Sequence, residues 1–108
     1  LLGDAAHAMF PFMGQGAGQS IEDAFVLAHC LAAGRDDPQR AIETYAARRY
    51  ERTAAVQTAS REAGRQMQMM DPAEVEERNA RLSANPEAPV ARFDWLWSYD
   101  VESAMAAG

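Results

Sequence analysis

Apolar residues recur at intervals of three and four along residues 17–33, the most regular amphipathic stretch of the chain. The positions on this face are Ile21, Ala24, Phe25, Ala28 and Leu31, with Leu27 beside them. Their spacing predicts an α-helix that begins at Gly16 or one residue later. Glu22 and Asp23 come early in it, where the helix dipole favours acids. Gly34 follows as the expected helix end.

A second, longer helical pattern starts at Pro38 and continues to about residue 70. Asp37 and Pro38 are typical of the N-cap and the first position of a helix, and the stretch contains one glycine, Gly64. Its interrupted apolar face consists of Ile42, Tyr45, Ala46, Arg49, Tyr50, Val56 and Ala59. A continuous helix would be roughly 50 Å long at about 1.5 Å per residue. The pattern therefore allows either one long helix or a break near residues 58–64. We expect three methionines near its end to fill packing space: they are Met67, Met69 and Met70.

The remainder of the chain is less regular. Asp71 and Pro72 repeat the cap-and-proline signal and predict a short helix over residues 73–82. Turn formers follow. Residues 90–98 hold most of the tail's aromatic side chains and fit either a two-turn helix or an extended arm that docks on a surface. We expect residues 99–108 to taper into a frayed end.

The beginning of the chain has a different pattern, an apolar start that runs into turn formers. The two leading leucines resemble the end of a short buried strand, which Gly3 and Asp4 terminate. Residues 9–13 are apolar but interrupted by Pro11, so we expect a loop there. Exposed loops are normally polar. An apolar loop therefore indicates a cover, such as a cofactor ring or another domain.

Asp4 and the segment Gly14-Gln15-Gly16-Ala17-Gly18 carry most of the chemical information. Glycine permits a positive φ and lets a ligand approach the backbone closely. The helix that begins here offers free N–H groups and about half a positive charge. Asp4 is then either a turn-capping residue or a carboxylate that accepts hydrogen bonds from sugar or polyol hydroxyls. The segment lacks the Lys-Ser/Thr pair of a P-loop. It also has no third glycine at the spacing that the dinucleotide fingerprint requires after a strand, so both motifs are excluded.

Composition narrows the function classes. The formal charge is −6 and all ten basic residues are arginine, which disfavours nucleic acid as a partner. No run of 18 apolar residues occurs, so we expect no membrane partner. The only histidines, His7 and His29, do not have metal-ligand spacing, and we predict no metal site; His7 fits a hydrogen-bonded structural group better than a general base. The single cysteine, Cys30, predicts a small buried filler and is compatible with the cytoplasm.

Four segments together carry a family resemblance. They are Gly3-Asp4-Ala5-Ala6-His7, Pro11, Gly14-Gln15-Gly16 and Ile21-Glu22-Asp23-Ala24. Across these 22 positions the chain resembles the second FAD-binding motif of the flavin-dependent aromatic hydroxylases, of the salicylate and p-hydroxybenzoate hydroxylase kind. Residues 93–100 weakly resemble the carboxyl-terminal end of salicylate-hydroxylase-like members.

The resemblance implies a role for each matching residue. Asp4, next to Gly3, matches the aspartate that hydrogen-bonds the ribityl chain of FAD. Pro11 matches a proline beside the isoalloxazine ring and the substrate. A further match covers the loop and helix start whose backbone, in the family, faces the pyrimidine side of the flavin. The matching residues here are Gly14, Gln15, Gly16 and Ala17. Gly18 stands where many members carry Asn, which leaves this backbone role intact.

The resemblance also implies the wider chemistry: FAD as cofactor, NAD(P)H as co-substrate, and O2-dependent hydroxylation of a small aromatic substrate. We expect residues 1–35 to be the last part of an FAD-binding domain and residues 36–108 to be a helical carboxyl-terminal region. The chain itself should be mostly α, with a strand stub, a cofactor loop and three or four helices. The parent fold should be α/β with a Rossmann-like FAD-binding domain.

The family's amino-terminal GxGxxG fingerprint and its central DG motif do not occur in these residues. We therefore interpret the chain as a carboxyl-terminal fragment. Its partner would be the missing amino-terminal part of the same protein, and the catalytic residues, unknown here, would lie outside it. Two alternatives stay open: another FAD-dependent oxidoreductase of the superfamily, such as a geranylgeranyl-reductase-like or squalene-epoxidase-like enzyme, or a cofactor-free helical interaction module.

Overall fold

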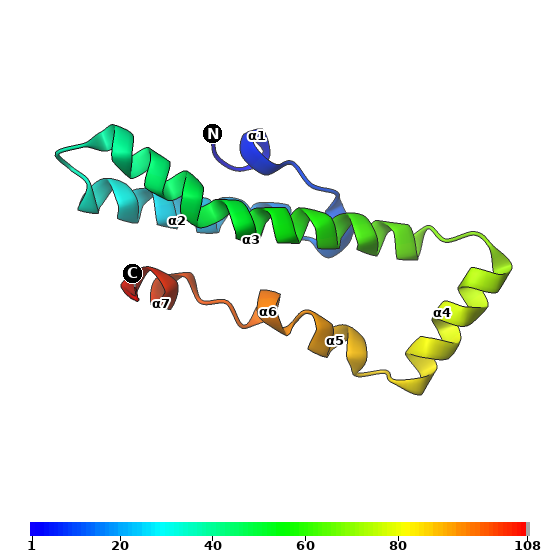
Figure 1. Ribbon diagram of the computed structural model, residues 1–108. Helices are drawn as coiled ribbons and strands as arrows, with labels where there is room; N and C mark the ends of the chain where they lie inside the picture. Colours follow the sequence, from blue (N-terminus) through cyan, green and yellow to red (C-terminus); the bar gives the residue numbers. More distant parts are fainter. Residues whose placement is uncertain (108) are drawn as a thin grey trace.

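Two antiparallel helices form the body of the protein, and the other segments lie against them or return beside them (Figure 1). The computed structural model describes residues 1–107. The two long helices, α2 (Gly16–Ala33) and α3 (Pro38–Met67), are joined by a short turn and pack side by side. The remaining elements are α1 (Asp4–His7), the 3-10 turn η1 (Pro11–Met13), α4 (Pro72–Ala84), α5 (Ala88–Arg92), α6 (Asp94–Trp97) and α7 (Val101–Ala106).

The boundaries of the three longer helices follow the signals in the sequence. The Asp37 side chain accepts a 3.1 Å hydrogen bond from the backbone N–H three residues on, and Pro38 opens α3. The Asp71 side chain caps α4 by accepting a 2.8 Å hydrogen bond from the backbone N–H two residues on. Gly34 ends α2, and its N–H donates to Cys30 O at 2.9 Å. The mostly helical class and these helix ends are therefore confirmed.

The apolar core lies at the end of the hairpin nearest the α2–α3 turn. Its buried members come from three helices and are Val26, Cys30, Ala41, Tyr45 and Met105. Since α7 supplies Met105 and packs against α2, the end of the chain closes this core. The prediction that Cys30 is a buried filler is confirmed.

The tail is more ordered than its small residues predict. Residues 101–106 form α7, whose Met105 is buried, so the expected frayed end is wrong over this stretch. Val101, Ala104 and Met105 recur at helical spacing and all pack on the core, which is why the segment holds its place. Gly108, the last residue of that prediction, lies outside the described residues.

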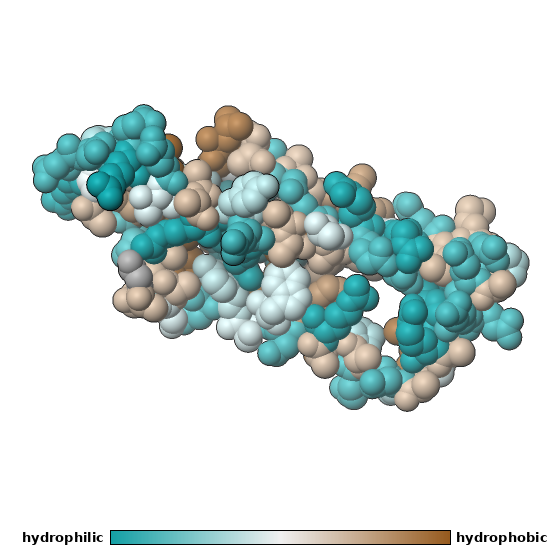
Figure 2. Space-filling view, in the orientation of Figure 1, coloured by the Kyte–Doolittle hydropathy of each residue, from teal (hydrophilic) through white to brown (hydrophobic). Residues whose placement is uncertain are grey.

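The strand predicted for the two leading leucines does not form. Residues 1–107 contain no strand, and a strand requires a neighbour that pairs with its backbone groups. Leu1 is 89% exposed, and Figure 2 shows apolar atoms at the surface beside the amino terminus. The strand stub is therefore wrong for the described chain.

The long helix α3 runs without interruption for 30 residues. The break considered near residues 58–64 is absent. Gly64 is buried within the helix under the Phe12 ring of η1, and a Cβ at this position would overlap that ring. The prediction that the methionines fill packing space is wrong for Met67 and Met70, both exposed at the turn where α3 gives way to α4.

The segment with the tail aromatics forms neither one two-turn helix nor an extended arm. It forms the short helices α5 and α6, and it returns alongside α3 (Figure 1). Arg52 of α3 holds it in place: the guanidinium donates to Leu96 O at 3.4 Å and lies 3.7 Å from the centroid of the Tyr99 ring. Figure 2 shows openings between α3 and the returning chain, so this contact is local.

The apolar face predicted for α2 lies at the surface. Ile21 is 72% exposed, and Phe25 and Leu31 are also exposed. The opposite face packs on α3, and near the start of α2 it is polar, with Gln19 and Asp23 fully buried. The spacing thus located the helix correctly but did not identify the side that contacts α3.

Candidate functional site

Asp4 lies at the surface beside the first residue of α2. A Cβ added at Gly16 would be 3.9 Å from Asp4 Oδ1, so the carboxylate and the helix start border the same space. Gln15, the N-cap of α2, makes no side-chain capping hydrogen bond. The first-turn N–H groups of a helix have no intrahelical acceptor. This terminus therefore offers hydrogen-bond donors and a partial positive charge to a bound group.

The loop between Asp4 and α2 is fastened to α3 through its backbone. Gln57 Nε2 donates to Ala8 O at 2.9 Å, and Ser60 Oγ donates to Phe10 O at 2.6 Å. Both donors come from α3, so the long helix sets the distance between the loop and the start of α2.

The conformation of the loop depends on a proline and a glycine. Pro11 opens η1, and Gly14 ends it with φ +63°, its N–H donating to Pro11 O at 2.9 Å. A Cβ at Gly14 would meet nothing within 4 Å, so the left-handed backbone alone favours glycine there. Part of the cover expected over this apolar loop is α3 itself, because Phe12 packs over Gly64.

Behind this surface lies a buried carboxylate, Asp23, which is 0% exposed. Its Oδ2 accepts from the Gly3 N–H at 2.9 Å and pairs with His7 Nε2, and its Oδ1 accepts from Arg49 Nε at 2.6 Å. Burial raises the pKa of Asp23, but hydrogen bonds from Arg49, Gly3 and His7 outweigh burial and hold the pKa below its usual value. The group is therefore an anion at neutral pH.

Arg49 extends this contact into a cluster. It donates to Gln19 Oε1 at 2.7 Å and to Glu22 Oε2 at 2.8 Å. Glu22 accepts two further hydrogen bonds from Arg52, at 2.7 and 2.9 Å. Each buried charge thus faces an opposite charge, which is the condition under which a protein interior tolerates such groups.

His7 belongs to this cluster rather than to the surface. It is 5% exposed, its Nε2 pairs with Asp23, and its Nδ1 is buried with no hydrogen-bond partner among residues 1–107. The geometry fits the structural group expected from its place in a tight turn.

The sequence analysis missed the cluster. It placed Arg49 in the apolar face of α3 without a partner, and it explained Glu22 and Asp23 by the helix dipole. A signal was present, because Arg49 follows Tyr45 by four residues and so shares its face. A buried guanidinium requires a carboxylate, and the two adjacent acids of the neighbouring helix could have been assigned to it.

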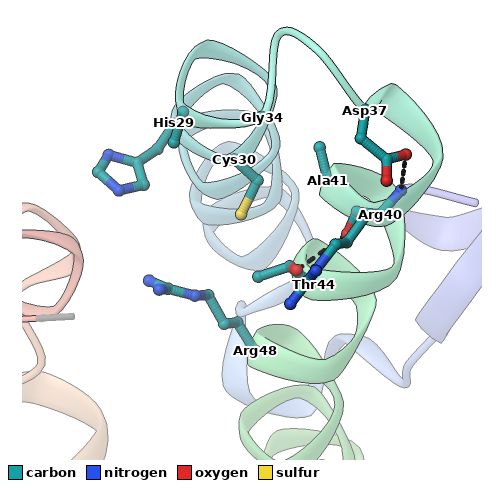
Figure 3. A pocket seen from close by; sticks show the side chains of 9 residues that line it. His29, Cys30, Gly34, Asp37, Arg40, Ala41, Thr44 and Arg48 are labelled. Atoms are coloured by element: carbon teal, nitrogen blue, oxygen red, sulfur yellow. Dashed lines mark hydrogen bonds between the residues drawn. The ribbon is translucent and has the colours of Figure 1, made fainter.

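A separate hollow of about 340 Å³ lies at the other end of the hairpin, between the end of α2 and the start of α3 (Figure 3). Arg40, Arg48 and His29 border it, and the sulfur of Cys30 points into the space between the helices. None of the predicted site residues lines this hollow. This hollow is therefore separate from Asp4 and the start of α2.

Within residues 1–107, no group of three or more His, Cys, Asp or Glu side chains is placed to hold a metal ion. No helix in that part of the chain combines the length and the apolar character needed to cross a membrane. The groups that the structure does bring together are the Asp4 carboxylate and the start of α2.

The comparison with known families identifies the family to which this chain belongs. The FAD binding domain family matches residues 1–63, a stretch that includes Asp4, the loop, α2 and Arg49. The chain belongs to this family, whose cofactor is FAD. The resemblance seen in the first 24 residues is confirmed.

Characterised relatives are similar over nearly the whole chain. A salicylate hydroxylase of Pseudomonas putida is 40% identical over 109 residues, a 3-amino-4-hydroxybenzoate 2-monooxygenase of Streptomyces cremeus 36% over 97, and a 3-hydroxybenzoate 6-hydroxylase of Polaromonas naphthalenivorans 32% over 106. The alignments cover 98%, 90% and 98% of this chain but only 24%, 24% and 26% of the relatives. The chain thus spans about a quarter of their length. No solved structure matches it.

Proposed function

We propose that this chain forms part of the FAD site of an aromatic-ring hydroxylase that uses NAD(P)H and O2. Membership of the FAD binding domain family supports the cofactor. The substrate class rests on the relatives, whose names specify oxygenation of salicylate, 3-amino-4-hydroxybenzoate and 3-hydroxybenzoate. A small aromatic compound of this kind is the proposed substrate, and the flavin, when bound, supplies the redox and oxygen chemistry.

The observation that carries the proposal is the exposed Asp4 carboxylate beside the start of α2, which lacks a side-chain cap. A carboxylate accepts hydrogen bonds from a row of hydroxyl groups such as the ribityl chain of FAD. Backbone N–H groups at a helix start suit an electron-rich ring edge that gains negative charge on reduction. The residues present therefore fit one side of a flavin.

The other predicted residues take supporting roles in this proposal. Gly3 provides the positive φ that turns the chain into Asp4. Pro11 and Gly14 shape the apolar loop that would lie beside the ring. Gln15, Gly16 and Ala17 form the start of α2 and present backbone N–H groups.

The rest of the site would come from other parts of a longer protein. We propose an α/β parent with a Rossmann-like FAD-binding domain, in which residues 1–35 complete that domain and residues 36–108 form the helical carboxyl-terminal region. The amino-terminal part of the same protein would supply the dinucleotide fingerprint and the catalytic residues. A cytoplasmic location fits this class of enzyme.

The central test is Asp4→Ala in the full-length protein. We expect largely apo-protein after purification, because the ribityl hydroxyls lose their charged acceptor. Flavin content per polypeptide, read from the absorbance spectrum, measures the effect. Asp36→Ala, an exposed acid in the α2–α3 turn, is the matched control and should keep its flavin. Normal flavin occupancy in Asp4→Ala would overturn the assignment.

A second test uses the 108 residues alone. We expect the isolated chain to purify without flavin absorbance, because it provides only one side of the cofactor site. A yellow preparation with one flavin per chain would show that the remaining parts of the proposed protein are not needed for binding.

A further inference from the structure

We propose that the buried Asp23 is a positioning residue that holds Asp4 in place for the flavin. The proposal rests on the function proposed above, and it assigns a role to a cluster that the FAD-binding motif does not explain by itself. Asp23 is 0% exposed and cannot touch a ligand. It acts through the short turn that carries Asp4.

Asp23 contacts that turn on both sides of Asp4. The Gly3 N–H, one residue before Asp4, donates to Asp23 Oδ2 at 2.9 Å. The ring of His7, three residues after Asp4, pairs with the same oxygen through Nε2. One buried carboxylate oxygen therefore fixes both ends of the segment from which the Asp4 side chain projects.

The turn cannot hold this shape without help. The helix α1 has four residues and no side-chain cap, and one helical turn is too short to be stable by itself. Gly3 is held at φ +62° close to Ser20, whose Oγ would lie 3.0 Å from an added Cβ. Asp4 therefore depends on a support outside its own turn, and Asp23 supplies it.

Asp23 is in turn fixed by α3. Arg49 Nε donates to Asp23 Oδ1 at 2.6 Å, and the same guanidinium donates to Gln19 and Glu22 on α2. Asp23 is thus locked to α2 and α3 while it holds α1. Because Asp4 must stay beside the start of α2 to face one ligand together with it, this link keeps two parts of the proposed site in register.

The experiment is a double-mutant cycle on FAD affinity in the full-length apo-protein, using Asp4→Asn and Asp23→Asn. FAD is titrated and its fluorescence quenching gives Kd. We expect Asp4→Asn to weaken binding about 10- to 100-fold through the lost charged acceptor. Asp23→Asn should weaken binding about 10-fold when Asp4 is present and less than about 2-fold when Asp4 is already Asn.

The cycle separates positioning from general stability. If Asp23 only stabilised the fold, its replacement would weaken FAD binding by the same factor in both backgrounds, and the proposal would be overturned. An unchanged Kd in Asp23→Asn would overturn it as well. An unchanged Kd in Asp4→Asn would instead overturn the proposed function itself, so the two failures are distinguishable.

Two further variants protect the test against misfolding. His7→Ala leaves the pair between Asp23 and Arg49 intact and removes one of the two contacts that Asp23 makes with the turn. We expect FAD binding to be about 5-fold weaker when Asp4 is present, and nearly unchanged when Asp4 is already Asn. If Asp23→Asn does not fold, the cycle between His7→Ala and Asp4→Asn decides the question by the same criteria. Asp36→Asn, the same substitution at an exposed acid of the α2–α3 turn, is the control and should leave the Kd of FAD unchanged.

Discussion

The two ends of the α2–α3 hairpin are held together by different physical means. Near the turn, the helices and α7 share an apolar core that includes Val26 and Met105. Near the open end, the same helices are joined by hydrogen-bonded charges centred on Asp23 and Arg49. The same two helices are thus joined by nondirectional apolar packing near the turn and by directional hydrogen bonds between charged groups near the open end.

The difference matters because the candidate flavin residues lie at the polar end. Apolar packing loses stability gradually as methyl groups are removed. A buried charge cluster requires each partner and also fixes the distances between its members. We infer that both ends stabilise the hairpin, while the polar end in addition orients the turn that carries Asp4.

The largest expected effect comes from removing the central cation of the polar end. Arg49→Ala leaves the buried Asp23 without its arginine and Glu22 with Arg52 alone, and breaking a buried pair costs about 3–5 kcal/mol. Urea unfolding of the chain, followed by circular dichroism, measures the change in the free energy of unfolding. Arg49→Lys keeps the charge but not the three-way donor geometry, and it should lie between Arg49→Ala and the original protein. A loss below about 1 kcal/mol for Arg49→Ala would mean that the cluster does not support the hairpin.

A smaller loss is expected at the apolar end. Val26→Ala removes two methyl groups from a fully buried site, which should cost about 2 kcal/mol of unfolding free energy. Because Val26 belongs to the apolar core and carries no polar group that could hold the turn of Asp4, the Kd of FAD in the full-length protein should not change. Ile21→Ala, on the exposed face of the same helix, should stay within about 0.5 kcal/mol. A large loss of FAD affinity in Val26→Ala would break the division between the two ends.

The sequence predicted the helices well because their signals are local. The caps at Asp37 and Asp71 and the stop at Gly34 involve backbone groups within a few residues. The contacts that join segments far apart were not predicted. The hydrogen bond from Arg49 to Asp23 spans 26 residues, and only the packing of α2 on α3 brings these side chains together.

The candidate site was predicted through Asp4 and the glycines, because turn and helix-start residues have recognisable local chemistry. The side of α2 that packs on α3 was not. Apolar spacing places Ile21 and Phe25 on one face, but it does not specify what covers that face. The polar face of α2 is buried instead, because Arg49 of α3 neutralises the charge of its acidic side chains. The sequence of α2 by itself contains no sign of this partner.

Gly64→Ala tests the contact that ties the loop to α3. Alanine favours a helix over glycine by about 1 kcal/mol, but its Cβ would overlap the Phe12 ring, and overpacking costs about 1–3 kcal/mol. We expect a net loss of about 1 kcal/mol in urea unfolding. In a Phe12→Ala background the overlap is gone, and the same substitution should become stabilising. A stabilising Gly64→Ala in the original protein would show that Phe12 does not pack there.

Acid should weaken the polar end through Asp23, with the smallest effect of the four. The pKa of Asp23 is held below its usual value of 3.8, so its contribution is complete above the unfolded pKa and is lost as pH falls through the lower, folded pKa. We expect the free energy of unfolding to decrease as pH drops from about 4 to about 3. The loss is small because the folded carboxyl stays partly ionised in this window.

The control for the acid experiment comes from the opposite end of the hairpin. Val26→Ala carries no titrating group, so it should lower the whole curve of unfolding free energy against pH without changing its slope below about pH 4. Asp23→Asn removes the titrating group and should flatten that slope relative to the original protein. Equal slopes for Asp23→Asn and the original protein would mean that the acid sensitivity originates in other carboxyl groups. The two ends of the hairpin would then not differ in their response to acid because of the charged cluster.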